Sequence, residues 1–161
     1  MSQRETLISW LNDAYGLEQN LTKVLESHVD DAADQPQVQS RLRSHLEETK
    51  RHAELVEQCI EHLGGKPSAT KSAMGKMSGM LSGTSTAMAD DEMVKNMLSD
   101  YSMEHFEIAS YQSIIAAAEA LGEQQVAQTC REILHDEEDM AEWIEQQLPA
   151  ITNDYLMHQP A

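Results

Sequence analysis

The stretch SMEHFEIASYQ, residues 102–112, places acidic side chains inside an otherwise apolar helical pattern. Glu104, His105 and Glu107 fall within one helical turn, and apolar residues at helical spacing flank them on both sides. Buried carboxylates destabilise a helical core unless a cation or a hydrogen-bond donor pairs with them. The stretch predicts a core helix, and it raises the question of whether these acids face water, a basic partner or a metal ion.

The composition of the 161-residue chain favours one all-α domain over residues 1–161. Aromatic residues make up only 4% of the chain, so aliphatic side chains and methionine must fill the core. The net charge of -17 leaves no basic surface, and we expect no nucleic-acid partner. We find no apolar run of about 18 residues and no secretion signal, so we expect a cytoplasmic protein without membrane contact. Cys59 and Cys130 lie on apolar helical stripes and are expected to be buried core thiols.

Four segments carry apolar residues at alternating spacings of three and four, which predicts four long helices. Gly64 and Gly65 are expected to end the second helix, Gly122 the third, and Pro149 the fourth, with a loosely ordered tail after it. The predicted helices cover about residues 4–29, 37–63, 91–121 and 124–148.

The connections between these segments predict how the helices pair. The first two helices and the last two are joined by short links, which make antiparallel neighbours. The middle connection, residues 64–90, is long enough to cross the bundle, and it offers a short extra helix over about 72–81. Two hairpins joined by one long crossover define a ferritin-like antiparallel four-helix bundle.

Charged residues interrupt the apolar stripe of every predicted helix. With the two tight turns near residues 33 and 122, the inward acids of both hairpins lie about 15 residues from their turn, so they fall near mid-bundle in one layer. On the fourth helix the apolar stripe favours Glu137 as the inward acid, whereas the distance from the turn favours Glu138. Both are therefore kept as candidates. The candidate metal ligands are Glu18, Glu48, His52, Glu104, Glu107, Glu137 and Glu138, with His45 as a further candidate.

A layer of four or more acids cannot stay ionised in a dry core unless cations offset the charge. Carboxylate oxygens and imidazole nitrogens suit iron or manganese, whereas magnesium and calcium prefer oxygen ligands alone. We therefore expect two Fe (or two Mn) ions per chain. The remaining histidines are expected on the surface or beside the ligands; they are His28, His62, His105, His135 and His158.

Four stretches resemble the YciE/YciF-type ferritin-like stress proteins of bacteria, in order over about residues 5–147: AYGLEQNLTKVL, HLEETKRHAELVEQCIEHLGGKP, MEHFEIASYQSIIAAAEALG and ILHDEED. The resemblance implies a dimeric, rubrerythrin-like bundle with a candidate di-metal centre and stress-linked expression. It implies the same ligand positions, on helix one at Glu18, on helix two at Glu48 and His52, on helix three at Glu104 and Glu107, and on helix four at Glu137 and Glu138.

The chain departs from ordinary ferritins, because their Glu-x-x-His pattern is absent at the candidate ligand positions. Helix two offers His45-x-x-Glu48 and Glu48-x-x-x-His52, and helix four has Met140 and Ala141 where a second His would stand. This departure predicts an asymmetric, carboxylate-rich centre.

The leading hypothesis is a di-metal carboxylate protein that binds Fe(II) and oxidises it with O2 or peroxide. Tyr15 and Tyr111 are expected near the acid layer, where they could donate hydrogen bonds or electrons. The alternative is a metal-free structural or interaction protein, without enzymatic activity, whose acids share protons or are solvated. A homodimer is expected in either case.

Overall fold

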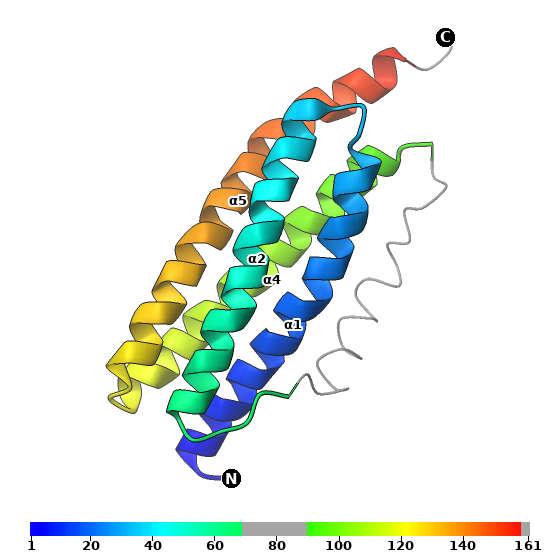
Figure 1. Ribbon diagram of the computed structural model, residues 1–161. Helices are drawn as coiled ribbons and strands as arrows, with labels where there is room; N and C mark the ends of the chain where they lie inside the picture. Colours follow the sequence, from blue (N-terminus) through cyan, green and yellow to red (C-terminus); the bar gives the residue numbers. More distant parts are fainter. Residues whose placement is uncertain (69–89, 159–161) are drawn as a thin grey trace.

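The computed structural model describes residues 1–68 and 90–158, and within them it forms one bundle of long helices (Figure 1). The short helix expected around residues 72–81 lies outside the described residues. The helices of the described part are α1 (Gln3–Asp31), α2 (Pro36–His62), α4 (Glu92–Ala120) and α5 (Gln124–Met157).

The helices pair as two antiparallel hairpins, α1 with α2 and α4 with α5, as the short links predicted. Contacts between α1 and α4 and between α2 and α5 join the two hairpins. The end of α2 and the start of α4 lie at opposite ends of the bundle (Figure 1). This is the predicted ferritin-like four-helix bundle, and the fold class is confirmed.

Local sequence accounts for three of the helix ends, namely the start of α1 and the ends of α2 and α4. Ser2 and Glu5 form a capping box at the start of α1, in which each side chain accepts a hydrogen bond from the other residue's backbone N–H. Gly64 and Gly122 follow α2 and α4 with φ angles of 81° and 75°, a left-handed conformation that glycine adopts without steric cost. The glycine stop signals are thus confirmed.

The prediction that Pro149 ends the last helix was wrong, because α5 continues through Pro149 to Met157. A proline inside a helix removes one backbone hydrogen bond and costs about 3 kcal/mol. The burial of Ile151 in an apolar cluster with Val38 and Ile144 offsets this cost. Residues 152–157, which were expected to belong to a loosely ordered tail, are helical for this reason.

We predict that Ile151→Ala destabilises the protein by about 2–4 kcal/mol, because it opens a cavity in a buried cluster. Leu156→Ala, also on α5 after Pro149, is the matched control. Leu156 is exposed, so its loss should cost less than about 0.5 kcal/mol. Urea unfolding followed by circular dichroism measures both. Equal effects of the two substitutions would show that Ile151 does not anchor the part of α5 after Pro149 to the bundle.

Two apolar clusters fill the two ends of the bundle and leave charged side chains between them. One cluster contains Leu7, Ile60 and Ile133, and the other contains Leu25, Met97 and Ile144. The layer that separates them is therefore bordered by apolar side chains on both sides.

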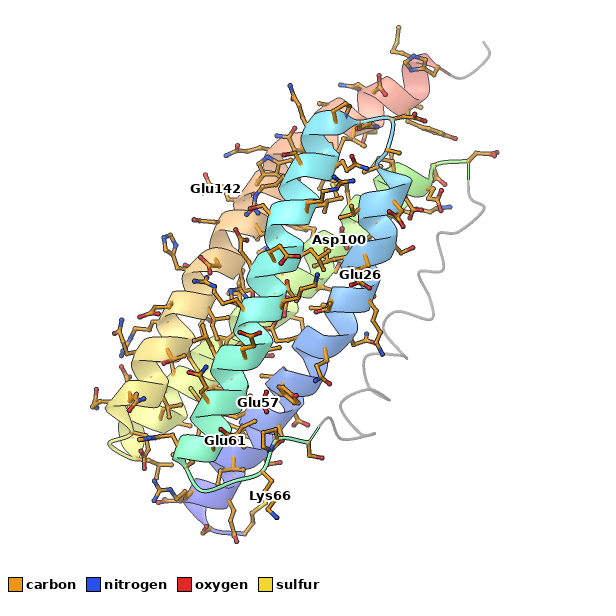
Figure 2. All side chains as sticks on the ribbon, viewed as in Figure 1. Glu26, Glu57, Glu61, Lys66, Asp100 and Glu142 are labelled. Carbon is orange, nitrogen blue, oxygen red and sulfur yellow. The ribbon has the colours of Figure 1, made fainter. Side chains whose placement is uncertain are left out.

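Most acidic side chains that do not belong to this layer are exposed on the surface of the bundle. Exposed acids such as Glu26, Glu61 and Glu142 lie on the outer faces of the helices, as the sticks in Figure 2 show. No helix of the described residues is long and apolar enough to cross a bilayer.

Candidate metal centre

Six ionisable side chains meet in the layer between the apolar clusters, and each is no more than 3% exposed. Every helix contributes at least one of them. On α2 the two histidines are seven residues apart, so two helical turns place them on the same face. The six residues are Glu18 on α1, His45 and His52 on α2, Glu104 and Glu107 on α4, and Glu137 on α5.

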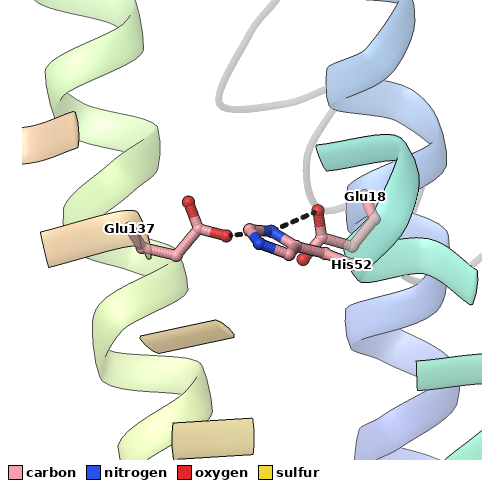
Figure 3. Close-up of side chains that lie close together, drawn as sticks. All are labelled: Glu18, His52 and Glu137. Carbon is pink, nitrogen blue, oxygen red and sulfur yellow. Dashed lines mark ion pairs between the residues drawn. The ribbon is translucent and has the colours of Figure 1, made fainter. Parts of the chain in front are cut away.

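One group within the layer joins Glu18, His52 and Glu137 (Figure 3). His52 Nδ1 lies 2.8 Å from Glu137 Oε1 and 3.8 Å from Glu18 Oε2. The imidazole thus stands between two carboxylates that come from different hairpins.

A second group joins His45, Glu104 and Glu137. His45 Nε2 lies 3.0 Å from Glu104 Oε1 and 3.7 Å from Glu137 Oε2. In both groups the ligand atoms fall within 4.8 Å of one another, a spacing that can surround a metal ion. Glu137 belongs to both groups and offers a different oxygen to each.

Glu107 completes the layer from α4, one turn beyond Glu104. Its side chain is buried and its Oε1 has no hydrogen-bond partner. Burial raises the pKa of Glu107 well above its ordinary value, and the charges of Glu137 and Glu18 add to this effect.

Several polar atoms of the layer are buried without a hydrogen-bond partner in the described residues. His52 Nδ1 and Glu137 Oε1 are among them despite their short separation, because their contact lacks hydrogen-bond geometry. An unpaired buried polar atom costs about 1–3 kcal/mol, and more when it is charged. The unpaired atoms are Glu18 Oε2, His52 Nδ1, Glu104 Oε2, Glu107 Oε1, Glu137 Oε1 and Glu137 Oε2. Six unpaired donor atoms of metal-binding chemistry in one dry layer fit the binding of cations.

The pKa values show how the layer responds to its own charge. Burial raises the pKa of Glu18 and of Glu104 to about 8. Burial alone would lower the pKa of His52, but Glu137 and Glu18 outweigh it and raise that pKa to about 9. The same balance, with Glu104 as the main partner, raises the pKa of His45. Without cations, the layer therefore retains protons at neutral pH.

Tyr111 lies beside the layer as a hydrogen-bond donor, which agrees with its predicted position near the acids. Its hydroxyl donates to Glu18 Oε1, on the far side of the carboxylate from His52. Burial raises the pKa of Tyr111, and the nearby Glu18 raises it further, so the phenol stays protonated. Tyr15 is half-buried and packs against the apolar cluster instead.

Glu48 lies outside the layer, contrary to its predicted place within it. Thr49 occupies the inward position on this turn of α2, and Glu48 points to the helix edge with 28% of its side chain exposed. It contacts His45 Nδ1 at 3.0 Å and accepts a hydrogen bond from Arg41. The hydrogen bond to His45 lowers the pKa of Glu48 to about 2, so Glu48 is an ionised outer partner of His45.

Asp136 has the same role for the other histidine. Its Oδ2 lies 3.0 Å from His52 Nε2, and it also accepts a hydrogen bond from Arg51. Each histidine therefore turns one ring nitrogen to the layer and the other to an outer carboxylate held by arginine. Sequence analysis missed Asp136; the available signal was its place beside Glu137 on the helix facing α2.

On α5 the structure separates the two alternatives that the sequence left open. Glu137 is fully buried in the layer, whereas Glu138 is exposed. The stripe of buried residues, which includes Cys130, Ile133 and Ile144, fixes the inward face of α5 at Glu137. The link between α4 and α5 is centred on Gly122 as assumed, and Glu137 follows it by 15 residues just as Glu107 precedes it by 15, so the height count that favoured Glu138 was wrong by one residue.

A further buried pair lies nearer the end of α1. His28 Nδ1 contacts Asp100 at 2.8 Å for Oδ1 and 3.0 Å for Oδ2, and both side chains are buried. His28 was expected on the surface or beside the ligands, but it pairs with Asp100, four residues before Glu104. The ion pair joins α1 to α4 and lies outside the two metal-binding groups.

Known proteins share this architecture. Protein YciF of Escherichia coli (strain K12) is 27% identical over 140 residues, which cover 83% of this chain and 82% of YciF. The crystal structure of that protein, described as a stress protein, has a TM-score of 0.79 at 22% identity and covers 95% of this chain and 98% of YciF.

Two further solved structures extend the comparison. A protein of Xanthomonas campestris pv. campestris is 34% identical with a TM-score of 0.82, over 98% of this chain and 97% of its own. A ferritin-like, diiron-carboxylate protein of Bacillus anthracis str. Ames has a TM-score of 0.70 at 18% identity, over 92% of this chain and 99% of its own, and this likeness shows the fold alone. The sequence model of one protein family matches residues 2–157. The chain belongs to that family, the domain of unknown function DUF892.

Proposed function

We propose that the buried layer binds two iron or manganese ions with Glu137 shared between them. The observation that carries this proposal is the placement of the two Glu137 oxygens, one toward His52 and one toward His45. A carboxylate that offers one oxygen to each of two ligand groups would be a ligand shared by both ions. Helical bundles build di-metal sites from inward carboxylates and histidines in this way.

The proposed ligands divide into two sets. Glu18, His52 and Glu137 would hold one ion, and His45, Glu104 and Glu137 the other, with the unpaired Oε1 of Glu107 available beside them. Mixed carboxylate and imidazole donors favour iron or manganese over magnesium and calcium. The diiron-carboxylate name of the Bacillus anthracis protein, which shares the fold, supports the same class of metal.

We propose that the protein oxidises Fe(II) with O2 or peroxide, and this proposal requires the metal site. The iron pair would supply the electrons for that reaction. The chain's own residues hold the ligands in place. Tyr111 donates a hydrogen bond to Glu18. The outer carboxylates Glu48 and Asp136 orient the imidazole rings of the two histidines. The apolar clusters on both sides exclude bulk water.

Rapid mixing of the anaerobically Fe(II)-loaded protein with O2 tests this activity. We expect ferric absorbance to appear at least about tenfold faster than with the same Fe(II) in buffer, and Glu18→Gln with Glu107→Gln to abolish the acceleration. Glu26→Gln, which changes an exposed acid of α1, is the control and should leave the rate unchanged. An acceleration that survives loss of both buried acids would contradict the proposal.

We predict that Asp136→Asn weakens Fe(II) or Mn(II) binding about 10- to 100-fold, because the amide no longer fixes the ring and protonation of His52. Asp139→Asn is the matched control, since Asp139 is exposed on the same helix. Anaerobic calorimetric titration measures both variants. Equal affinities in wild type and Asp136→Asn would show that His52 does not need its outer partner.

A metal-free structural or interaction protein remains the alternative, and the relative described as a stress protein is compatible with it. The two proposals differ in thermal stability. A metal that links four helices should raise the melting temperature, and a chelator should remove that gain. A melting temperature that is identical with Fe(II), with Mn(II) and with chelator would favour the alternative.

We further propose a cytoplasmic homodimer without nucleic-acid partners, on the charge of -17 and on the prevalence of two-fold assemblies. Light scattering at several protein concentrations tests the assembly. A mass far above that of two chains of 18.0 kDa would contradict the dimer.

A further inference from the structure

The two cysteines form a pair of buried thiols that the proposed metal chemistry does not use. Cys59 on α2 and Cys130 on α5 are both free, and both belong to the apolar cluster at the end of the bundle where α1 begins. Cys59 keeps 5% of its surface exposed and Cys130 keeps none. They belong to different hairpins.

The register of α2 against α5 places the two thiols face to face. These antiparallel helices are in contact where His52 approaches Glu137 at 2.8 Å. Cys59 lies seven residues after His52, and Cys130 lies seven residues before Glu137. Seven residues make about two turns, so both cysteines lie at one level, about 10 Å from the layer and on the same helix faces. The thiol of each cysteine is the main influence on the pKa of the other, as expected for two side chains that lie close together.

We propose that Cys59 and Cys130 are a redox-sensitive pair, which peroxide converts into an intramolecular disulfide between α2 and α5. The geometry that such a bond requires is two facing thiols at one level, because cysteines on diverging faces cannot be joined without moving the backbone. The proposal does not depend on the metal centre.

The surroundings of the two sulfurs assign different roles to them. Hydrogen bonds from the Cys130 thiol and from Thr129 lower the pKa of Cys59, so Cys59 is the sulfur that more readily becomes a thiolate. The hydrogen bond to Cys59 and burial raise the pKa of Cys130, which remains a thiol until Cys59 has reacted. The residual exposure of Cys59 also makes it the sulfur that peroxide reaches first.

The reaction then balances in two steps. The Cys59 thiolate attacks one oxygen of hydrogen peroxide, the O–O bond breaks, and the hydroxide released takes up the thiol's proton to form water. The Cys130 sulfur attacks the resulting sulfenic acid, an S–S bond forms, and the second oxygen leaves as water with the Cys130 proton. The two sulfurs lose two electrons and one peroxide is reduced to two molecules of water.

A disulfide at this place would tie the two hairpins together and close the long loop from residue 59 to residue 130. Cross-links that close long loops stabilise proteins most, because they restrict the unfolded chain. We expect the oxidised protein to melt about 10 °C higher than the reduced protein, and a thiol reductant to reverse the gain.

The test uses the full, metal-free chain, treated with hydrogen peroxide, unfolded, alkylated and digested with trypsin for mass spectrometry. We expect two alkylated cysteines before treatment, none after it, and one peptide pair joined through Cys59 and Cys130. Two alkylatable thiols after treatment of the folded protein, or disulfides only between chains, would overturn the proposal. Because metal is absent, either result is independent of the proposed iron chemistry.

Single variants test the assigned roles. In Cys130→Ala, peroxide should leave a sulfenic acid on Cys59 that dimedone traps. In Cys59→Ala, loss of the Cys130 thiol should be at least about tenfold slower than loss of the wild-type pair. Equal rates for the two single variants would overturn the assignment of Cys59 as the attacking sulfur. Near-native circular dichroism confirms that each variant is folded.

Discussion

Glu137→Gln should abolish the binding of both metal ions, with a loss of at least about 100-fold in affinity for each. The two oxygens of Glu137 face different histidines, at 2.8 Å for His52 and 3.7 Å for His45. An amide keeps the size of the side chain but removes its charge, and its nitrogen cannot bind a cation. Loss of a shared ligand therefore weakens both sites, whereas loss of Glu18 or Glu104 removes a ligand from one group only.

The neighbouring acid provides the control for this prediction. Glu138→Gln removes the same charge one residue further along α5, but Glu138 is exposed. Anaerobic titration with Fe(II) or Mn(II) should give wild-type stoichiometry for Glu138→Gln and no measurable binding for Glu137→Gln. Similar losses in both variants would mean that the negative charge of the protein as a whole attracts the metal, and that the buried carboxylate of Glu137 has no special role.

The stability of the metal-free protein should fall as pH rises, with a melting temperature about 10 °C lower near pH 9 than near pH 5. The buried acids Glu18 and Glu104 have pKa values near 8, above the ordinary value of 4.5. The folded state therefore binds more protons than the unfolded state between these values, and that stabilisation is lost as pH rises through about 8.

The histidines act in the same direction. The pKa of His52 is raised from 6.5 to about 9, so the contribution of His52 is fully present below pH 6.5 and is lost as pH rises through about 9. His45 follows with its own raised pKa. Glu48 acts oppositely, but only below its ordinary value of 4.5, because its pKa is lowered to about 2.

Metal should reverse this dependence on pH. Cations compete with protons for the same carboxylates and imidazoles, so their affinity and their stabilising effect grow as pH rises. We expect the difference in melting temperature between Mn(II)-loaded and metal-free protein to widen from near pH 6 to near pH 8. A metal-free protein whose stability rises over this range would show that the acids of the layer are not buried as described.

The bundle could be predicted from the sequence because its signals are local and repeated. Apolar spacing identified the helices, and Gly64 and Gly122 ended α2 and α4 where left-handed backbone is needed. The layer of acids was predictable from interruptions of the stripes, since a helix shows its inward face in its periodicity.

The finer features depend on packing that no local pattern contains. At Pro149 the local rule predicted a helix end, but the tertiary burial of Ile151 overrode it. Glu48 fitted the height of the layer, yet Thr49 took the inward position, because helix rotation is set by neighbouring helices. The pairing of His28 with Asp100 joins residues of two hairpins, which sequence spacing cannot reveal.

The most direct test of the central claim is the number of metal ions per chain. The protein would be purified without chelator, reloaded with Fe(II) in the absence of oxygen, freed of unbound metal and measured by elemental analysis. A shared Glu137 between two ligand groups predicts about two irons per chain. The absence of stoichiometric metal in the folded protein would contradict the claim, and the acids would then face only one another and their protons.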